Sequence, residues 1–76
     1  MPHIIVKIAV GRSDENKHLI ATALTKAIMH SAQVPDEALS VSIEDFDPAE
    51  WGAKVFKPDI IDKPDLLYKK PGYTPA

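Results

Sequence analysis

The order of three segments, a strand, a long helix and a second strand, constrains the fold of this chain more than any other feature. Residues 3–9 read His3-Ile4-Ile5-Val6-Lys7-Ile8-Ala9, a β-branched run that is apolar on both faces and typical of a strand buried in a sheet. Residues 39–44 alternate apolar and polar with period two, which predicts a second strand. This order favours an α/β fold built on a right-handed βαβ unit with parallel strands.

The segment between the two strands is predicted to be a helix over about residues 14–33. Ser13 is a good N-cap, and Asp14 and Glu15 then fall in the first turn, where carboxylates suit the helix dipole. Pro35 ends the segment and biases Val34 toward an extended conformation. Apolar residues recur at helical spacing and predict one buried stripe: Leu19, Ile20, Ala23, Leu24, Ala27 and Ile28.

The length of 76 residues predicts a single domain, residues 1–76, with a marginal core. A domain of this size buries only about 60% of the surface that its unfolded chain exposes. No cysteine is present to cross-link it, so we expect oligomerisation to supply the missing burial. Two parallel strands and one helix cannot protect their edges, and we therefore predict a homodimer with one four-stranded sheet and both helices on one face.

Composition and charge exclude several classes of function. A formal net charge of −2 argues against a nucleic-acid partner, which would need a basic surface. The apolar start is too short for a signal peptide and nothing approaches the length of a membrane span, so a cytoplasmic protein is expected. His3, His18 and His30 lack metal-ligand spacing, and no glycine-rich phosphate loop or nucleophile elbow is visible. We expect neither a metal nor a cofactor.

The second half of the chain is less regular. Asp47-Pro48-Ala49-Glu50 predicts a capped helical turn, with Asp47 as cap and Pro48 at the first helical position. Lys54-Val55-Phe56 suggests a short strand, and the prolines that follow divide the rest into short irregular pieces. We expect this C-terminal segment to pack on the domain or on a partner, because several of its residues are too apolar for a free tail: Ile60, Ile61, Leu66, Leu67 and Tyr68.

Three further residues could carry chemistry. If Met1 is removed, Pro2 becomes a secondary amine at the start of a strand, and such an amine can act as a base when it is neutral and held in a pocket. Arg12 lies just past the far end of the same strand and would reach a site only across a subunit interface or over the sheet. Trp51 follows the second strand. Taken singly, Arg12 is better interpreted as a solvated cation and Trp51 as a core or interface anchor.

Together these residues resemble the 4-oxalocrotonate tautomerase family. The matching pieces, spread over roughly residues 2–52, are Pro2 before an apolar strand, Gly11-Arg12-Ser13-Asp14-Glu15 opening the helix, Pro35, the βαβ order and an aromatic residue at position 51. The ending Lys69-Lys70-Pro71-Gly72-Tyr73 is similar to that of a longer, dimeric bacterial subgroup that tautomerises phenylpyruvate. The resemblance implies a tautomerase fold, Pro2 as catalytic base, Arg12 as a carboxylate-binding residue and Trp51 as a pocket wall.

One position departs from the family pattern. The prototype of the family has a second arginine in the second strand, where it helps to bind a dicarboxylate, and the aligned residue here is Ser40. A hydroxyl has no charge and much less reach, so the substrate expected at Arg12, Ser40 and Trp51 is a 2-oxo monocarboxylate with an aromatic or apolar body. The expected function is a keto-enol isomerase acting without a cofactor. The alternatives are a hydratase or dehalogenase on the same fold, or a non-catalytic dimeric binding module.

Overall fold

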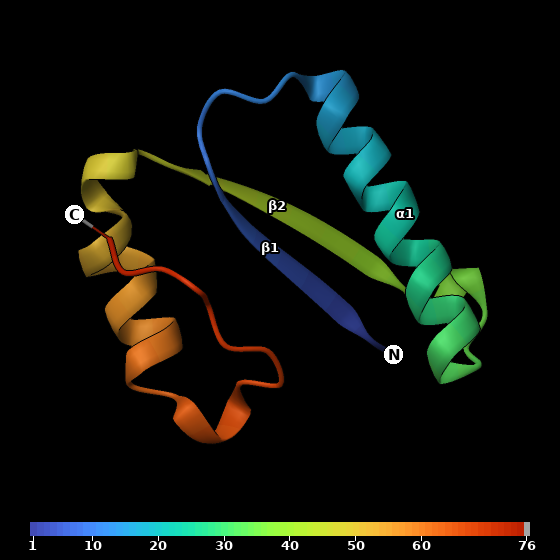
Figure 1. The fold of residues 1–76 in the computed structure, drawn as a ribbon. Helices are drawn as coiled ribbons and strands as arrows, with labels where there is room; N and C mark the ends of the chain where they lie inside the picture. The colour runs from blue at the N-terminus through green and yellow to red at the C-terminus, as the bar shows by residue number, and fades with distance from the viewer. Residues whose placement is uncertain (76) are drawn as a thin grey trace.

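A computed structural model, which describes residues 1–75, contains the expected strand–helix–strand unit (Figure 1). Strand β1 (His3–Ala9) and strand β2 (Ser40–Phe46) are parallel and lie side by side, and helix α1 (Asp14–Ala32) connects them. In their register His3 is opposite Ser40 and Ala9 is opposite Phe46. The prediction of an α/β fold with a parallel βαβ unit is confirmed.

Helix α1 begins where the local sequence predicts. The hydroxyl of Ser13 accepts a hydrogen bond from the backbone N–H of Asn16 (3.1 Å), which satisfies one of the free donors of the first turn. Gly11 precedes this cap with a φ of +121°, a conformation that a side chain would disfavour. Gln33 ends the helix in the left-handed region.

The two faces of the sheet have different neighbours. Ile8 and Asp45 are opposite each other in the register, as are Lys7 and Glu44. Because side chains alternate along a strand, Asp45 and Lys7 point to opposite faces. Asp45 forms an ion pair with Lys17 of α1, and Lys7 forms one with Asp59 of the C-terminal segment. Helix α1 therefore covers one face of the sheet and the C-terminal segment approaches the other, as Figure 1 shows.

The C-terminal segment is helical where a strand was expected. A 3-10 turn (Pro48–Glu50) follows β2, and Asp47 caps it by accepting from the N–H of Ala49 (2.9 Å), which confirms the predicted turn. The chain then forms a π-helix (Gly52–Ile61) and another 3-10 turn (Pro64–Leu66). The predicted strand at Lys54-Val55-Phe56 is wrong. Its two apolar residues are instead the buried face of the π-helix.

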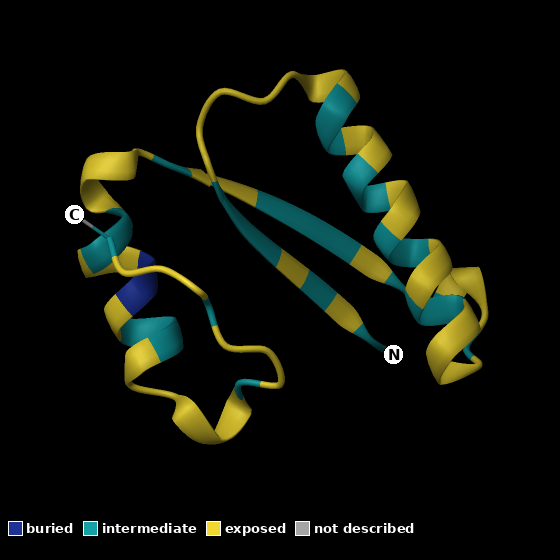
Figure 2. Cartoon of the chain, viewed as in Figure 1, coloured by how far each residue is buried: buried dark blue, intermediate teal, exposed yellow. Residues whose placement is uncertain are grey.

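The core of one chain is thin (Figure 2). Among the described residues only Val55 and Phe56 are buried. The stripe predicted on α1 is partly confirmed, since Ile20, Leu24 and Ile28 are half-buried while Ala23 and Ala27 are exposed and Leu19 is 63% exposed. In the C-terminal segment Ile60 and Leu67 are half-buried, but other large apolar residues remain exposed: Ile61, Leu66 and Tyr68.

Candidate active site

Pro2 and Ser40 lie together at the amino ends of the two strands. Pro2 is half-buried, and its carbonyl oxygen accepts a hydrogen bond from the N–H of Ser40 (3.4 Å). The hydroxyl of Ser40 is 2.6 Å from Nδ1 of His3. Met1 precedes them and is fully exposed. While Met1 is attached, the nitrogen of Pro2 is an amide and has no basic lone pair.

Arg12 and Trp51 lie at the opposite end of the sheet. Arg12 follows the carboxyl end of β1, where its guanidinium donates to the side-chain oxygen of Asn16 (3.3 Å) and is otherwise exposed. Trp51 comes five residues after β2 ends. The seven-residue strands separate these residues from Pro2 by about 20 Å, at roughly 3.3 Å per residue. Within one chain the four predicted site residues therefore form two groups.

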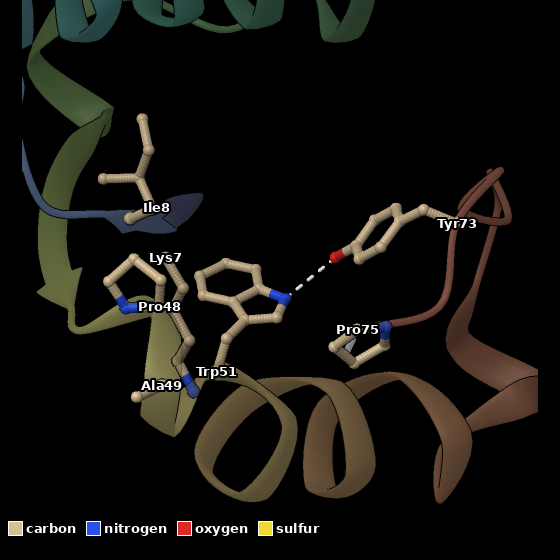
Figure 3. A pocket seen from close by; sticks show the side chains of 8 residues that line it. Lys7, Ile8, Pro48, Ala49, Trp51, Tyr73 and Pro75 are labelled. Atoms are coloured by element: carbon tan, nitrogen blue, oxygen red, sulfur yellow. Dashed lines mark hydrogen bonds between the residues drawn. The ribbon is translucent and has the colours of Figure 1, made fainter.

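A cavity of about 630 Å³ adjoins Trp51, between the carboxyl-terminal half of β1 and the C-terminal segment (Figure 3). Most of its wall is apolar. Polar side-chain groups come from Lys7, from Tyr73 and from the indole N–H of Trp51. Arg12 is not part of this wall, although it belongs to the same end of β1. The wall residues shown in Figure 3 come from β1, from the turn after β2 and from the end of the chain: Lys7, Ile8, Ala9, Pro48, Ala49, Trp51, Tyr73 and Pro75.

Trp51 is held in this wall from two sides. Its indole N–H donates to the hydroxyl of Tyr73 (2.8 Å), as the dashed line in Figure 3 marks. Its ring meets Phe46 edge-on, with ring centroids 6.2 Å apart and planes at 85°. Tyr73 in turn packs on the buried Phe56 at a centroid distance of 5.6 Å. Edge-to-face and tilted contacts of this kind are favourable for aromatic rings.

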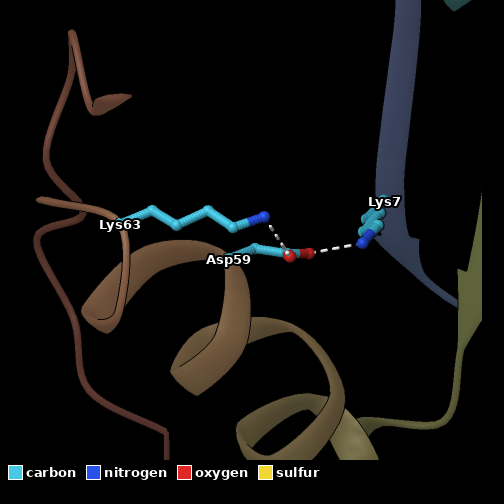
Figure 4. A network of polar contacts seen from close by, with 3 residues as sticks. All are labelled: Lys7, Asp59 and Lys63. Atoms are coloured by element: carbon cyan, nitrogen blue, oxygen red, sulfur yellow. Dashed lines mark hydrogen bonds and ion pairs between the residues drawn. The ribbon is translucent and has the colours of Figure 1, made fainter. Parts of the chain in front are cut away.

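An ion pair joins Lys7, which lines the cavity, to the C-terminal segment (Figure 4). Its ammonium group donates to Asp59, whose other oxygen lies 3.6 Å from the ammonium of Lys63. The hydrogen bond to Asp59 raises the pKa of Lys7 above its ordinary value, against a smaller opposing effect of desolvation. The same bond holds the pKa of Asp59 below its ordinary value, and the charge of Lys63 adds to this effect. At neutral pH both groups are therefore charged.

Sequence reasoning missed Lys7 and Tyr73 as wall residues. Lys7 reads as an interruption of an apolar strand, and Tyr73 lies 22 positions from its hydrogen-bond partner Trp51, so no local pattern links them. Ser40 also borders a second cavity, of about 510 Å³, between α1 and the start of β2. In residues 1–75 no group of three or more histidine or acidic side chains is arranged to hold a metal ion. No helix within the described residues is long and apolar enough to cross a membrane.

Comparison with known proteins identifies the family. The model of the family described as "Tautomerase enzyme" matches residues 2–57. This chain belongs to the tautomerase family. A probable tautomerase of Xylella fastidiosa (strain 9a5c) is 42% identical over 73 residues, which cover 96% of this chain and 89% of the relative. Tautomerase PptA of Cronobacter sakazakii (strain ATCC BAA-894) is 34% identical over 96% of this chain and 97% of its own length.

Solved structures agree with this assignment. The crystal structure of TomN, a 4-oxalocrotonate tautomerase homologue of the tomaymycin biosynthetic pathway, superposes with a TM-score of 0.64 at 34% identity, over 66% of this chain and 77% of that one. Apo unfused 4-OT gives a TM-score of 0.62 at 31% identity, over 64% and 80%. The tautomerase is thus an enzyme of the isomerase class, and the resemblance to the 4-oxalocrotonate tautomerase family is confirmed.

Proposed function

We propose that this tautomerase, once Met1 has been removed, interconverts the enol and keto forms of a 2-oxo monocarboxylate with an aromatic or apolar body, such as a phenylpyruvate-like enol. The observation that carries the proposal is that the family match begins at Pro2, the first residue before β1. Met1 is fully exposed and open to an aminopeptidase. The mostly apolar cavity beside Trp51 favours an apolar body, and Ser40 supplies no second cation for a dicarboxylate.

The reaction needs one base and one anion-binding group, and no cofactor. An α-amino group has a pKa of about 7.7–8.0, and an apolar pocket or a nearby cation lowers such a value toward neutrality. The neutral amine of Pro2 takes the proton of the enol hydroxyl, and the oxygen lone pair forms the carbonyl. The electrons of the carbon–carbon double bond then take the proton from the Pro2 ammonium at the adjacent carbon. A well-placed base of this kind contributes about 10²–10⁴-fold to the rate.

The site is built from two chains. Pro2 and Arg12 are at opposite ends of β1 in one chain, and a carboxylate held by Arg12 would lie far from the base of the same chain. A two-fold axis beside the middle of β1, at its outer edge, removes this difficulty, because the β1 strand of the second copy then runs antiparallel to the first. The amine of one chain then lies beside Arg12, Trp51 and the cavity of its partner, and a C2 dimer contains two such sites.

The edge of β1 is suited to this pairing. Among the described residues, β1 exchanges backbone hydrogen bonds only with β2, so its outer edge is unpaired. An antiparallel pairing centred on Ile5 sets Pro2 opposite the partner's Ile8, which lines the cavity. It also brings Ile5, 56% exposed in one chain, next to its own copy. This pairing yields the four-stranded sheet of the proposed homodimer.

The proposal is tested by comparing trimmed and untrimmed protein. Intact-mass measurement establishes whether Met1 is present, and ketonisation of the phenylpyruvate enol is followed by its ultraviolet absorbance. We expect trimmed protein to be active and protein with Met1 or any N-terminal extension to be nearly inactive, because the Pro2 nitrogen is then an amide. Pro2→Ala should be milder, since a primary amine remains after trimming.

Three outcomes separate the alternatives. Equal activity with and without Met1 removes Pro2 from the mechanism. A trimmed protein that adds water to an unsaturated acid or releases halide, but does not ketonise enols, indicates a hydratase or dehalogenase. Binding of an aromatic carboxylate without any turnover indicates a binding module that retains the fold and the pocket.

A further inference from the structure

The last residues of the described chain fold back onto Trp51. Tyr73 accepts the hydrogen bond from the indole N–H, its ring packs on the buried Phe56, and Pro75 lies beside Gly52. Tyr73 and Pro75 also line the cavity (Figure 3). The C-terminal end thus contacts Trp51, which precedes the π-helix, Gly52, which begins it, and Phe56, which is buried in its middle.

These contacts fix Trp51 in one orientation. Its ring lies nearly perpendicular to that of Phe46, and its single hydrogen-bond donor is already bonded to Tyr73. The indole therefore presents to the cavity an apolar surface with no free polar group. A flat apolar body binds well against such a wall and a short aliphatic one binds only weakly, because the free energy of burial grows with the apolar area in contact.

We propose that Tyr73 is a positioning residue that holds Trp51 as the specificity wall of the cavity, so that the C-terminal end selects aromatic over small aliphatic carboxylates. The proposal rests on the proposed function for the identity of the site, because it takes the cavity as the place where the body of the substrate binds. Tyr73 itself acts through Trp51 and does not need to touch the reacting atoms.

The test compares Tyr73→Phe with Tyr68→Phe. The phenylalanine at 73 keeps the ring on Phe56 and removes only the acceptor for the indole N–H. Tyr68 is fully exposed in the same segment, so its substitution is a matched control. Trp51 is the only tryptophan of the chain, and its fluorescence reports both its own environment and ligand binding. The probes are 3-phenylpropionate and butyrate, which have no keto group and cannot be turned over.

We expect Tyr73→Phe to shift the emission of unliganded Trp51 and to weaken 3-phenylpropionate binding by about three- to tenfold, the effect of one lost hydrogen bond. Butyrate binding should change by less than about twofold, since its smaller body leaves most of the wall untouched. With the phenylpyruvate enol, KM should rise while kcat is retained. Tyr68→Phe should match the wild-type protein in every measurement.

The binding readout separates this inference from the proposed function. A protein that binds 3-phenylpropionate in a Tyr73-dependent way but never turns over an enol supports the positioning role and contradicts the tautomerase mechanism. An unchanged emission spectrum and unchanged affinities in Tyr73→Phe overturn the inference even if the enzyme is active. Equal losses for 3-phenylpropionate and butyrate overturn the selective role, because a general loosening of the fold would weaken both.

Discussion

In the proposed function, Ser40 and Arg12 decide which carboxylate the site accepts. The Ser40 hydroxyl lies within hydrogen-bond distance of His3 at the amino end of the sheet and brings no charge there. The guanidinium of Arg12 donates to Asn16 and is otherwise exposed. A site with one cation binds one carboxylate well and leaves a second one unpaired. Discrimination against dicarboxylates then follows from the cost of desolvating a charge without a partner.

Arg12→Ala should therefore reduce kcat/KM on 2-oxo monocarboxylates by about ten- to a hundredfold, since hydrogen bonds to charged groups contribute about 1.5–3 kcal/mol. Ser40→Arg should restore some turnover of a dicarboxylate relative to a monocarboxylate. Steady-state kinetics on both substrate classes measure the two effects. An Arg12→Ala enzyme with unchanged kcat/KM on every carboxylate would show that Arg12 is only a solvated surface residue.

For individual residues, the sequence best predicts features that depend on positions nearby in the chain, such as helix caps. The caps at Ser13 and Asp47 are confirmed because each rests on a side chain and a backbone N–H two or three positions away. The partnership of Trp51 and Tyr73 spans 22 positions and has no local signature. The placement of Pro2 and Arg12 at opposite ends of β1 follows directly from strand geometry. Their catalytic roles stay predictions.

Among the elements, periodicity predicts the βαβ unit well and the C-terminal segment poorly. β1 is a β-branched apolar run, β2 alternates with period 2 and α1 has apolar residues at helical spacing, and their order and direction are confirmed. Residues 52–61 carry Gly52 and Pro58, both unfavourable in helix interiors, and their buried pair Val55 and Phe56 is adjacent, as in a buried strand. Tertiary packing nevertheless makes the segment helical, because this pair is buried among the C-terminal contacts.

The ion pair of Lys7 with Asp59 should make docking of the C-terminal segment depend on pH. Because the pKa of Asp59 is lowered in the fold, its stabilising contribution is complete above the ordinary value of 3.8 and disappears as pH falls through the folded value. Because the pKa of Lys7 is raised, its contribution is complete below 10.5 and disappears as pH rises through the folded value. Docking should be strongest between these limits.

Asp59→Asn should remove the acid part of this dependence. We expect lower amide protection factors for residues 52–61 at neutral pH in this variant, and a smaller further loss of protection on acidification than in the wild-type protein, once the intrinsic exchange rate at each pH is divided out. Asp62→Asn is the control, because Asp62 pairs with Lys57 inside the same segment and not with the sheet. Identical exchange profiles for Asp59→Asn and Asp62→Asn would contradict a role for the pair in docking.

At the scale of the whole molecule, a single chain leaves several large apolar side chains exposed. Only two residues are buried among those described, the outer edge of β1 is unpaired, and Ile5 and Leu19 expose 56% and 63% of their surface. Apolar surface of this extent on so small a protein indicates a further partner. The sequence predicts this need from length, the lack of cysteine and the unprotected strand edges. The proposed position of the partner rests on the unpaired edge of β1 and on the separation of Pro2 and Arg12.

Light scattering at micromolar concentration should give the mass of two chains. The paired β1 edges and the covered apolar residues supply the burial that one chain lacks. A monomer at that concentration would contradict the two-chain site. A hexamer would instead indicate packing like that of the shorter family members, with the C-terminal segment failing to limit assembly to a dimer.

Complementation between two impaired variants tests the two-chain site most directly. One variant retains an N-terminal extension and so lacks the Pro2 amine, and the other carries Arg12→Ala. After equal amounts are unfolded together and refolded, half of the C2 dimers should be mixed, and one of the two sites in each mixed dimer is intact. Activity should rise from at most about a tenth of the wild-type value in either variant alone to about a quarter in the mixture. If the mixture is no more active than its two components, Pro2 and Arg12 do not act across the dimer.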